Sequence, residues 1–180
     1  MTDIPIVVVG LMGAGKSTVA RLLSEALGRP VRDSDEDLRE RYGRTAAELA
    51  AEFGAPELHA REAALLREAL ADDRLPVIAA AASTVENAES RKALAAAFVV
   101  FLDGPPEVLA ERMRSGTHRP RFLPDLVEML AEQRGRRLAY FLEVSDLTAD
   151  TSRRTPAEIA AEALARHAAR ERSEVTPRRP

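Results

Sequence analysis

Nine residues near the start of the chain carry the residue types and the spacing of a phosphate-binding loop. They read Gly-Leu-Met-Gly-Ala-Gly-Lys-Ser-Thr and fit the pattern G-x-x-x-x-G-K-S. Gly10, Gly13 and Gly15 allow a tight backbone turn whose N–H groups can surround phosphate oxygens. Lys16 would reach the β- and γ-phosphates of a nucleotide, and the Ser17 hydroxyl would bind Mg²⁺.

The flanking sequence has the strand, loop and helix order that this pattern requires. An apolar run, Ile4–Val9, precedes the loop, and an amphipathic stretch, Val19–Leu27, follows it. The helix would place its positive N-terminal end against the phosphates. A glycine-rich turn that fits the pattern by chance is the alternative, but the chain has only 9 Gly and two Lys. We therefore expect residues 10–18, including Ala14 and Thr18, to bind nucleotide phosphates.

A pair of carboxylates forms the second candidate group, in the run Asp33-Ser34-Asp35 at the end of an expected strand. Beside a phosphate loop, one carboxylate would hold Mg²⁺-bound water and the other would accept the proton of an attacking hydroxyl. The alternative is structural: Ser34 caps the next helix, and the acidic side chains favour its N-terminus. The residues by themselves leave both readings open.

Asp103 is a rival metal ligand. It ends the apolar run Phe98–Leu102, as a Walker B aspartate would. In kinases of this size the Walker B strand neighbours the phosphate-loop strand, and we expect that neighbour to be Pro76–Ala80. Asp103 is therefore the less favoured candidate.

A loop rich in Gly, Pro and Arg separates two long expected helices. It reads Ser-Gly-Thr-His-Arg-Pro-Arg over residues 115–121. A lid over residues 114–125 that brings Arg119 to the transferring phosphoryl group would add positive charge and exclude water. A plain surface loop in an arginine-rich protein is the alternative, and without further support it is slightly favoured.

Expected strands alternate with expected helices along the chain. The strands are Ile4–Val9, Pro30–Asp33, Pro76–Ala80, Ala97–Leu102 and Leu147–Asp150. The helices are Val19–Leu27, Asp35–Tyr42, Ala46–Phe53, Glu57–Ala71, Glu86–Ala95, Pro106–Arg114, Asp125–Glu143 and Pro156–Arg170. This alternation predicts parallel strands with right-handed crossovers, and hence a three-layer α/β domain. Capping boxes are expected at three helix starts, formed by the pairs Thr45 and Glu48, Ser83 and Glu86, and Thr155 and Glu158.

Composition restricts the classes of protein that the chain can belong to. Its 180 residues, with 46% hydrophobic content and a net charge of −3, fit one folded domain at residues 1–170 followed by a frayed tail at 171–180. Arginines interspersed with acidic residues indicate solvated helix faces, so we expect no nucleic-acid partner. No apolar run approaches a membrane span and no leader peptide is visible. The absence of Cys excludes disulfides and thiolate metal sites. We expect a cytoplasmic monomer with a small-molecule acceptor.

Several motifs together resemble the shikimate kinases over residues 6–164. They are the loop at 10–18, Asp33-Ser34-Asp35, Arg44–Leu49, Asp103–Glu107, Arg119-Pro120, Arg137 before Val144–Leu147, and Asp150-Thr151 leading to Thr155-Pro156. The resemblance implies a P-loop kinase fold with sheet order 2-3-1-4-5, helices on both faces and a lid. It also implies acceptor-binding helices at about 35–62, ATP and Mg²⁺, and phosphorylation of shikimate in aromatic amino-acid biosynthesis.

Individual roles follow from the same resemblance. Asp33 matches the carboxylate that holds Mg²⁺-bound water, and Asp35 matches the acid that binds the acceptor hydroxyl. Arg119 matches the lid arginine near the phosphates, with Lys16 and Asp35 as its catalytic partners. Arg137 matches an arginine that binds the acceptor carboxylate. Two further residues, Arg112 and Pro156, match those that flank adenine.

The departures from the family pattern fall on the acceptor side. His59 stands where the family has an arginine that forks onto the acceptor carboxylate, and Arg61 is expected on a different helix face. Ala81, Ala82 and Ser83 replace three glycines, so the backbone there cannot easily take a positive φ. In the lid, Arg121-Phe122 replaces an apolar pair.

Two hypotheses therefore stay open. The first is an ATP-dependent kinase that acts on shikimate or on a related hydroxylated acid, bound by Asp35, His59, Ala81, Ala82 and Arg137. The second is a nucleotide-binding protein of the same family that has a different acceptor or has lost transfer. A GTPase is disfavoured, since the chain has no Asn-Lys-x-Asp run for guanine.

Overall fold

One parallel β-sheet forms the centre of the molecule. The computed structural model of the chain describes residues 4–115 and 125–175. Within these residues the strands are β1 (Ile6–Gly10), β2 (Val31–Asp33), β3 (Val77–Ala79), β4 (Phe98–Asp103) and β5 (Leu147–Asp150). They pair in parallel in the order β2-β3-β1-β4-β5. This order confirms the prediction and places the phosphate-loop strand in the middle.

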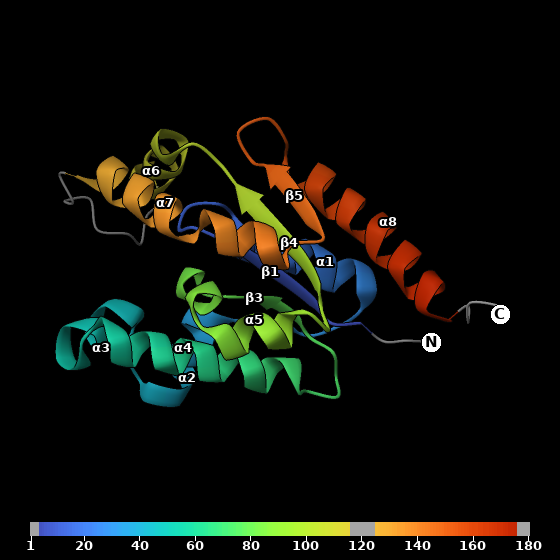
Figure 1. Cartoon of the computed structure of the whole chain (residues 1–180), viewed down its shortest axis with the longest axis horizontal. Helices are drawn as coiled ribbons and strands as arrows, with labels where there is room; N and C mark the ends of the chain where they lie inside the picture. Colours follow the sequence, from blue (N-terminus) through green and yellow to red (C-terminus); the bar gives the residue numbers. More distant parts are fainter. Residues whose placement is uncertain (1–3, 116–124, 176–180) are drawn as a thin grey trace.

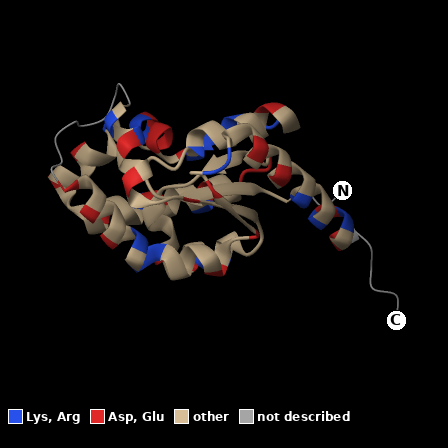
Figure 2. Ribbon diagram, turned by 90° about the horizontal axis from the view of Figure 1, so that it is seen from above, with Lys and Arg blue, Asp and Glu red and all other residues tan. Residues whose placement is uncertain are grey.

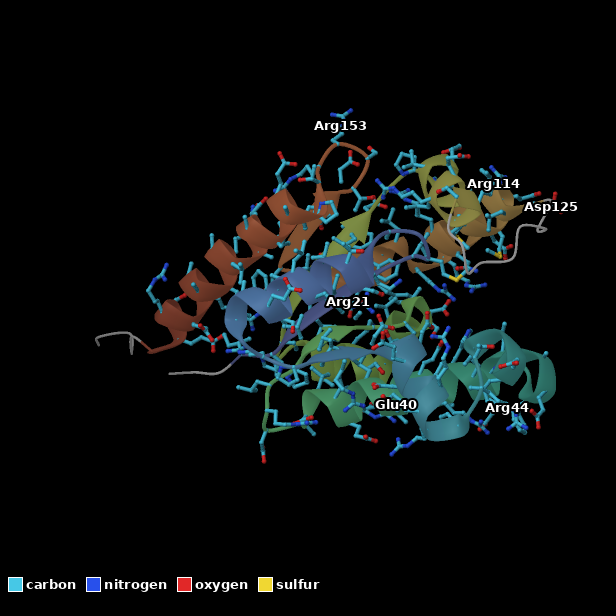
Figure 3. The ribbon with its side chains drawn as sticks, turned by 180° about the vertical axis from the view of Figure 1, so that it is seen from behind. Arg21, Glu40, Arg44, Arg114, Asp125 and Arg153 are labelled. Atoms are coloured by element: carbon cyan, nitrogen blue, oxygen red, sulfur yellow. The ribbon has the colours of Figure 1, made fainter. Side chains whose placement is uncertain are left out.

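Helices connect successive strands, as parallel pairing requires. They are α1 (Lys16–Leu27), α2 (Ser34–Tyr42), α3 (Ala46–Phe53), α4 (Ala55–Leu70), α5 (Ala88–Leu94), α6 (Pro106–Ser115), α7 (Leu126–Val144) and α8 (Pro156–Val175), with a 3₁₀ turn η1 (Ala82–Glu86). Helices α1 and α8 pack together on one face of the sheet, and α7 lies on the other (Figures 1 and 3). The arrangement confirms the three-layer prediction.

The core lies between the sheet and these helices. All five residues of β1 are buried, as are the first five of β4, because both faces of a parallel sheet are covered. Phe101 of β4 stacks on Phe141 of α7 with ring centroids 4.7 Å apart. The buried strands hold the carboxyl ends of the sheet in place, and that edge carries the chemistry in folds of this type.

Helices α2, α3 and α4 form a unit at one end of the molecule (Figure 1) with a small core of their own. That core is a cluster of Leu38, Leu49, Leu58 and Leu65. On its surface, the Arg61 guanidinium lies between the rings of Tyr42 and Phe53, 4.7 and 4.6 Å from their centroids. Arg61 also pairs with Glu57. The expectation that Arg61 faces away from His59 therefore agrees with its contacts.

One of the three predicted capping boxes is absent. Ser83 does not cap a helix with Glu86, because residues 82–86 form the 3₁₀ turn and the side chain of Asn87 caps α5. The capping boxes at Thr45 and Thr155 are present.

At the other end of the chain, α8 continues to Val175, so its helix includes residues predicted to fray.

No helix in the residues that the structure describes combines the length and the apolar character of a membrane span. Basic and acidic residues are interspersed along the helices in the view of Figure 2.

Candidate active site

The loop between β1 and α1 needs glycine at two positions for steric reasons. Gly10 and Gly13 have φ of 148° and 80°, which side-chain-bearing residues rarely adopt. A Cβ at Gly13 would lie 2.6 Å from the Leu109 carbonyl oxygen, and one at Gly10 would lie 2.5 Å from the Leu102 carbonyl oxygen. Both carbonyls belong to backbone that cannot retreat. The loop is therefore fixed against β4 and α6.

The helix that follows the loop begins in a way that suits an anion. Helix α1 starts at Lys16 after Gly15, has no side-chain cap and has no acidic residue in its first turn. Its first N–H groups therefore need partners from elsewhere, and the helix dipole favours a negative one. Lys16 donates from Nζ to the Leu11 carbonyl oxygen at 3.1 Å. Ala14 is buried inside the loop, and Thr18 is exposed on α1.

A direct hydrogen bond joins the phosphate loop to the end of β2. Ser17 Oγ donates to Asp33 Oδ2 at 2.6 Å, and Asp33 Oδ1 accepts from the Asp35 backbone N–H at 3.0 Å. Asp33 thus caps α2 and also reaches the loop, so the two readings of this acidic run are compatible. Ser34 is not the cap; its buried hydroxyl has no partner among the described residues.

The Ser17 hydroxyl and the Asp33 carboxylate could hold a magnesium ion only together with a bound phosphate. The residues that the structure describes contain no group of three or more His, Asp or Glu able to hold a metal. Mg²⁺ commonly keeps waters and takes one or two protein oxygens plus phosphate oxygens. The adjacent Ser17 hydroxyl and Asp33 carboxylate supply that kind of donor set.

Asp103 has a different partner. Its two carboxylate oxygens accept from Arg134 Nε and Nη2 at 3.0 and 2.7 Å. The argument from strand adjacency does not hold, because β1 pairs with β4 as well as with β3. Asp103 is disfavoured as a metal ligand because Arg134 already occupies its carboxylate, and not because of the position of its strand.

The two residues expected beside adenine lie around the loop that follows β5. Arg112 of α6 donates from Nη1 to Thr151 Oγ1 at 3.1 Å and from Nη2 to the Thr151 carbonyl oxygen at 2.6 Å. Pro156 begins α8 at the end of the same loop. These contacts fix the Arg112 side chain against the loop.

On the acceptor side, a buried carboxylate adjoins Asp35. Asp35 is exposed at the start of α2, whereas Glu62 of α4 is 7% exposed and accepts a hydrogen bond from Ser83 Oγ. Burial raises the pKa of Glu62, the Ser83 hydrogen bond opposes that rise, and the charge of Asp35 adds to it. Ser83 has therefore become a partner for Glu62.

His59 is half-buried near the same group of charges. Burial lowers the pKa of His59, and the positive charges of Arg137 and Arg136 lower it further, against a smaller opposing effect of Glu86. The imidazole is consequently neutral at pH 7. It offers one hydrogen-bond donor and one acceptor, not the charged fork of an arginine.

Arg137 of α7 is 4% exposed and already has protein partners. Its Nη1 donates to Gln133 Oε1 at 2.9 Å, and its Nη2 donates to Glu86 Oε2 at 3.2 Å. Glu86 Oε1 also accepts from Arg136 Nε at 2.7 Å. Burial alone would raise the pKa of Glu86, but the hydrogen bonds and charges of Arg137 and Arg136 hold the pKa of Glu86 below its usual range.

The turn in which Ala81, Ala82 and Ser83 replace glycines has an ordinary backbone. Ala81 has φ of −62° and ψ of 144°, and residues 82–86 form the 3₁₀ turn η1. None of the described residues at 81–83 has a positive φ. Ala81 and Ala82 are half-buried, and the chain accommodates the loss of glycine with a 3₁₀ turn.

The predicted lid residue, Arg119, lies outside the described residues, as do Pro120, Arg121 and Phe122. The residues on either side of this segment, Arg114 and Asp125, lie at the same end of the molecule as Arg44 of the acceptor-side unit (Figure 3).

Four residues of the acceptor side were not predicted as site residues: Glu62, Glu86, Gln133 and Arg136. Glu62 follows His59 by three residues on one helix, a spacing that places both on one face and could have identified it. Glu86 and Arg137 are 51 residues apart and meet only through the fold. No local sequence pattern predicts that contact.

Several known proteins are similar to this chain in sequence and in structure. The shikimate kinase family model matches residues 12–168. A shikimate kinase of Symbiobacterium thermophilum is 38% identical over 163 residues, covering 88% of this chain and 93% of that protein. The structure of a shikimate kinase from Acinetobacter baumannii in complex with shikimate has 28% identity and a TM-score of 0.84, covering 93% and 94% of the two chains. A gluconokinase from Sinorhizobium meliloti has 27% identity and a TM-score of 0.67, covering 97% and 99%.

Proposed function

The chain belongs to the shikimate kinase family, and we propose that it transfers the γ-phosphoryl group of ATP to a hydroxyl group of shikimate or a related hydroxylated acid. One observation carries the proposal: the 2.6 Å hydrogen bond from Ser17 to Asp33 joins the phosphate loop to the turn that bears Asp35. A phosphate held by the loop and a hydroxyl held by Asp35 would therefore be neighbours.

The residues support a transfer based on positioning and charge. The acceptor hydroxyl oxygen forms a bond to the γ-phosphorus, the bond from that phosphorus to the β–γ bridging oxygen breaks, and ADP leaves. Asp35 takes the hydroxyl proton. Lys16 and the N–H groups at the start of α1 stabilise the negative charge on the phosphoryl oxygens. We assign Arg119 the same task from the lid.

Mg²⁺ would be held by the Ser17 hydroxyl and, through water, by Asp33. It would supply charge neutralisation at the β- and γ-phosphates when bound. Asp33 orients this corner of the site, because its second oxygen holds the Asp35 backbone N–H at 3.0 Å. The position of the Asp35 carboxylate thus depends on the residue that serves the metal.

A family member with a different acceptor is the second candidate. The neutral His59 and the pairing of Arg137 with Glu86 favour it, since both weaken recognition of a carboxylate. The likeness to a gluconokinase gives an open-chain hydroxy acid as one compound to test. Loss of transfer is a further form of this candidate, against which the retained Asp35 argues.

The test is acceptor-dependent ADP release with Mg²⁺–ATP, measured for shikimate, gluconate and a panel of polyols. We expect release with shikimate, with formation of the phosphate ester. Asp35→Asn should lower kcat by about 10²–10⁴-fold, the usual contribution of a positioned base, while ATP binding is kept. Glu36→Gln is the matched control, because Glu36 lies exposed on the same helix as Asp35 and pairs with Arg21 of α1. ATP binding without release for any acceptor would contradict the proposal.

A further inference from the structure

Two arginines on α7 each donate to a carboxylate, and they differ in how completely their Nε and Nη2 groups are paired. Arg134 donates from both Nε and Nη2 to the two oxygens of Asp103, which is a complete side-on fork. Arg137, three residues further along, donates from Nη2 to Glu86, while its Nε has no partner among the described residues. One prong of the Arg137 fork is occupied, and the other is buried and unused.

The unused prong points to a ligand atom. A buried donor without a partner is costly, and a side chain that is 4% exposed has little access to bulk water. The neighbours of Arg137 include His59 and Glu62, whose pKa values its charge lowers, so its guanidinium faces the acceptor side of the site. An acceptor oxygen is thus a natural partner for Nε.

Glu86 limits how a carboxylate can use this edge. A carboxylate that forks onto Nε and Nη2 would meet the Glu86 oxygen already at Nη2, and two like charges there repel. Glu86 can yield, because its side chain is 25% exposed and its other oxygen is held by Arg136 at 2.7 Å. The Arg136 side chain is 51% exposed and can follow it outward.

We propose that Glu86 is a specificity-determining residue that competes with the acceptor carboxylate for Arg137. The proposal rests on the proposed function and names the acceptor property that it sets, which is tolerance of an uncharged group where a hydroxy acid has its carboxylate. Glu86 does not touch the reacting atoms; it acts on the acceptor through Arg137. The wild-type protein therefore distinguishes poorly between a hydroxy acid and its neutral ester.

The experiment measures binding of shikimate and of its methyl ester by calorimetry in the presence of Mg²⁺–ADP. We expect the wild-type dissociation constants for the two compounds to lie within about threefold of each other. Glu86→Gln keeps a hydrogen-bond acceptor for Arg137 but removes the charge, and should tighten shikimate binding roughly tenfold while leaving the ester unchanged. Glu89→Gln is the control, because Glu89 is exposed on α5, pairs with the exposed Lys92 and lies outside the site.

Each outcome bears on the inference. Wild-type binding of shikimate more than 100-fold tighter than of the ester would overturn it, and this measurement needs no variant to fold. Failure of E86Q to tighten shikimate binding, including no detectable binding to either protein, would overturn it as well. Absence of ADP release with every acceptor would instead contradict the proposed function, while the binding comparison would still decide the role of Glu86.

Discussion

The nucleotide side and the acceptor side of this site satisfy their polar groups in different ways. On the nucleotide side, α1 begins without a side-chain cap, and Ser17 and Asp33 are adjacent in a manner that suits a bound ion. On the acceptor side, Glu62 has Ser83, and Arg137 has Glu86 and Gln133. The first region is arranged for an external anion. The second has supplied much of its own charge and hydrogen bonding.

The contrast teaches how to interpret a lost motif residue. His59 replaces a charged fork, whereas Ser83 replaces a glycine and at the same time satisfies a buried group. Ser83 provides the hydrogen bond that the buried Glu62 needs, and the 3₁₀ turn accepts residues with side chains. The acceptor side is therefore altered as a connected set, so its substitutions should be tested in context.

Lys16→Ala is the most severe way to break the nucleotide side. We expect kcat to fall by at least about 10²–10³-fold, because a positioned charge on the transferring group is lost. Steady-state ADP release measures the effect, and thermal unfolding shows whether the fold is kept. Lys92→Ala is the control; Lys92 is the other lysine of the chain and lies exposed on α5, paired with Glu89. A K16A enzyme that keeps a tenth of the wild-type kcat would refute the assignment of Lys16.

His59→Arg would sharpen the comparison from the acceptor side. A guanidinium at this position adds a charged hydrogen bond to an acceptor carboxylate, worth about 1.5–3 kcal/mol, or roughly tenfold to a hundredfold in binding. The KM for shikimate should fall by that order, and the KM for ATP should not change. The neighbouring charges of Arg137 and Arg136 reduce the gain, whereas Glu86 supports it.

His59→Gln serves as the control for H59R, because glutamine is polar but carries no charge. An equal change of KM in both variants would show that carboxylate pairing is not the reason. An unchanged KM in H59R would show that the acceptor does not place a carboxylate at this position.

Glu62→Gln should give the smallest effect, seen in stability. Burial raises the pKa of Glu62 in the folded chain above its ordinary 4.5, so the native protein keeps this proton to higher pH than the unfolded chain does. Stability is then lost as the pH rises through the interval between the two pKa values, because the unfolded chain ionises first. The free energy of unfolding of E62Q relative to wild type should therefore increase from pH 4 towards neutral pH.

Urea unfolding at several pH values measures this difference, with Glu40→Gln on the exposed face of α2 as the control for removing a carboxylate. A relative stability that decreases with rising pH would mean that Glu62 is stabilised as a carboxylate in the folded chain.

The fold and the nucleotide side could be predicted because their signals are local. The loop pattern spans nine adjacent residues, and the alternation of apolar strands with amphipathic helices dictates parallel pairing. The start of α5 could not be predicted from a local pattern. Ser83 and Glu86 have the spacing of a capping box, but the buried Glu62, 21 residues earlier, takes the serine hydroxyl. A tertiary contact overrides the local pattern there.

The acceptor side was less predictable for the same reason. The resemblance identifies Arg137 as a carboxylate-binding residue, but no local pattern indicates Glu86 as its partner, because the two meet across η1 and α7. Asp103 shows the reverse case. Its strand looked like a metal-binding strand, and only the contact with Arg134 reveals the different partner.

The separate leucine cluster of α2, α3 and α4 has an evolutionary consequence. Because Leu38, Leu49, Leu58 and Leu65 form a core apart from the one beneath the sheet, α2 and α3 can change with little effect on the packing of the strands that hold the phosphate loop, whereas Leu66 and Ala69 of α4 belong to the core under the sheet. Mutations that adapt the enzyme to a new metabolite can then accumulate in one part of the molecule while ATP handling is inherited unchanged.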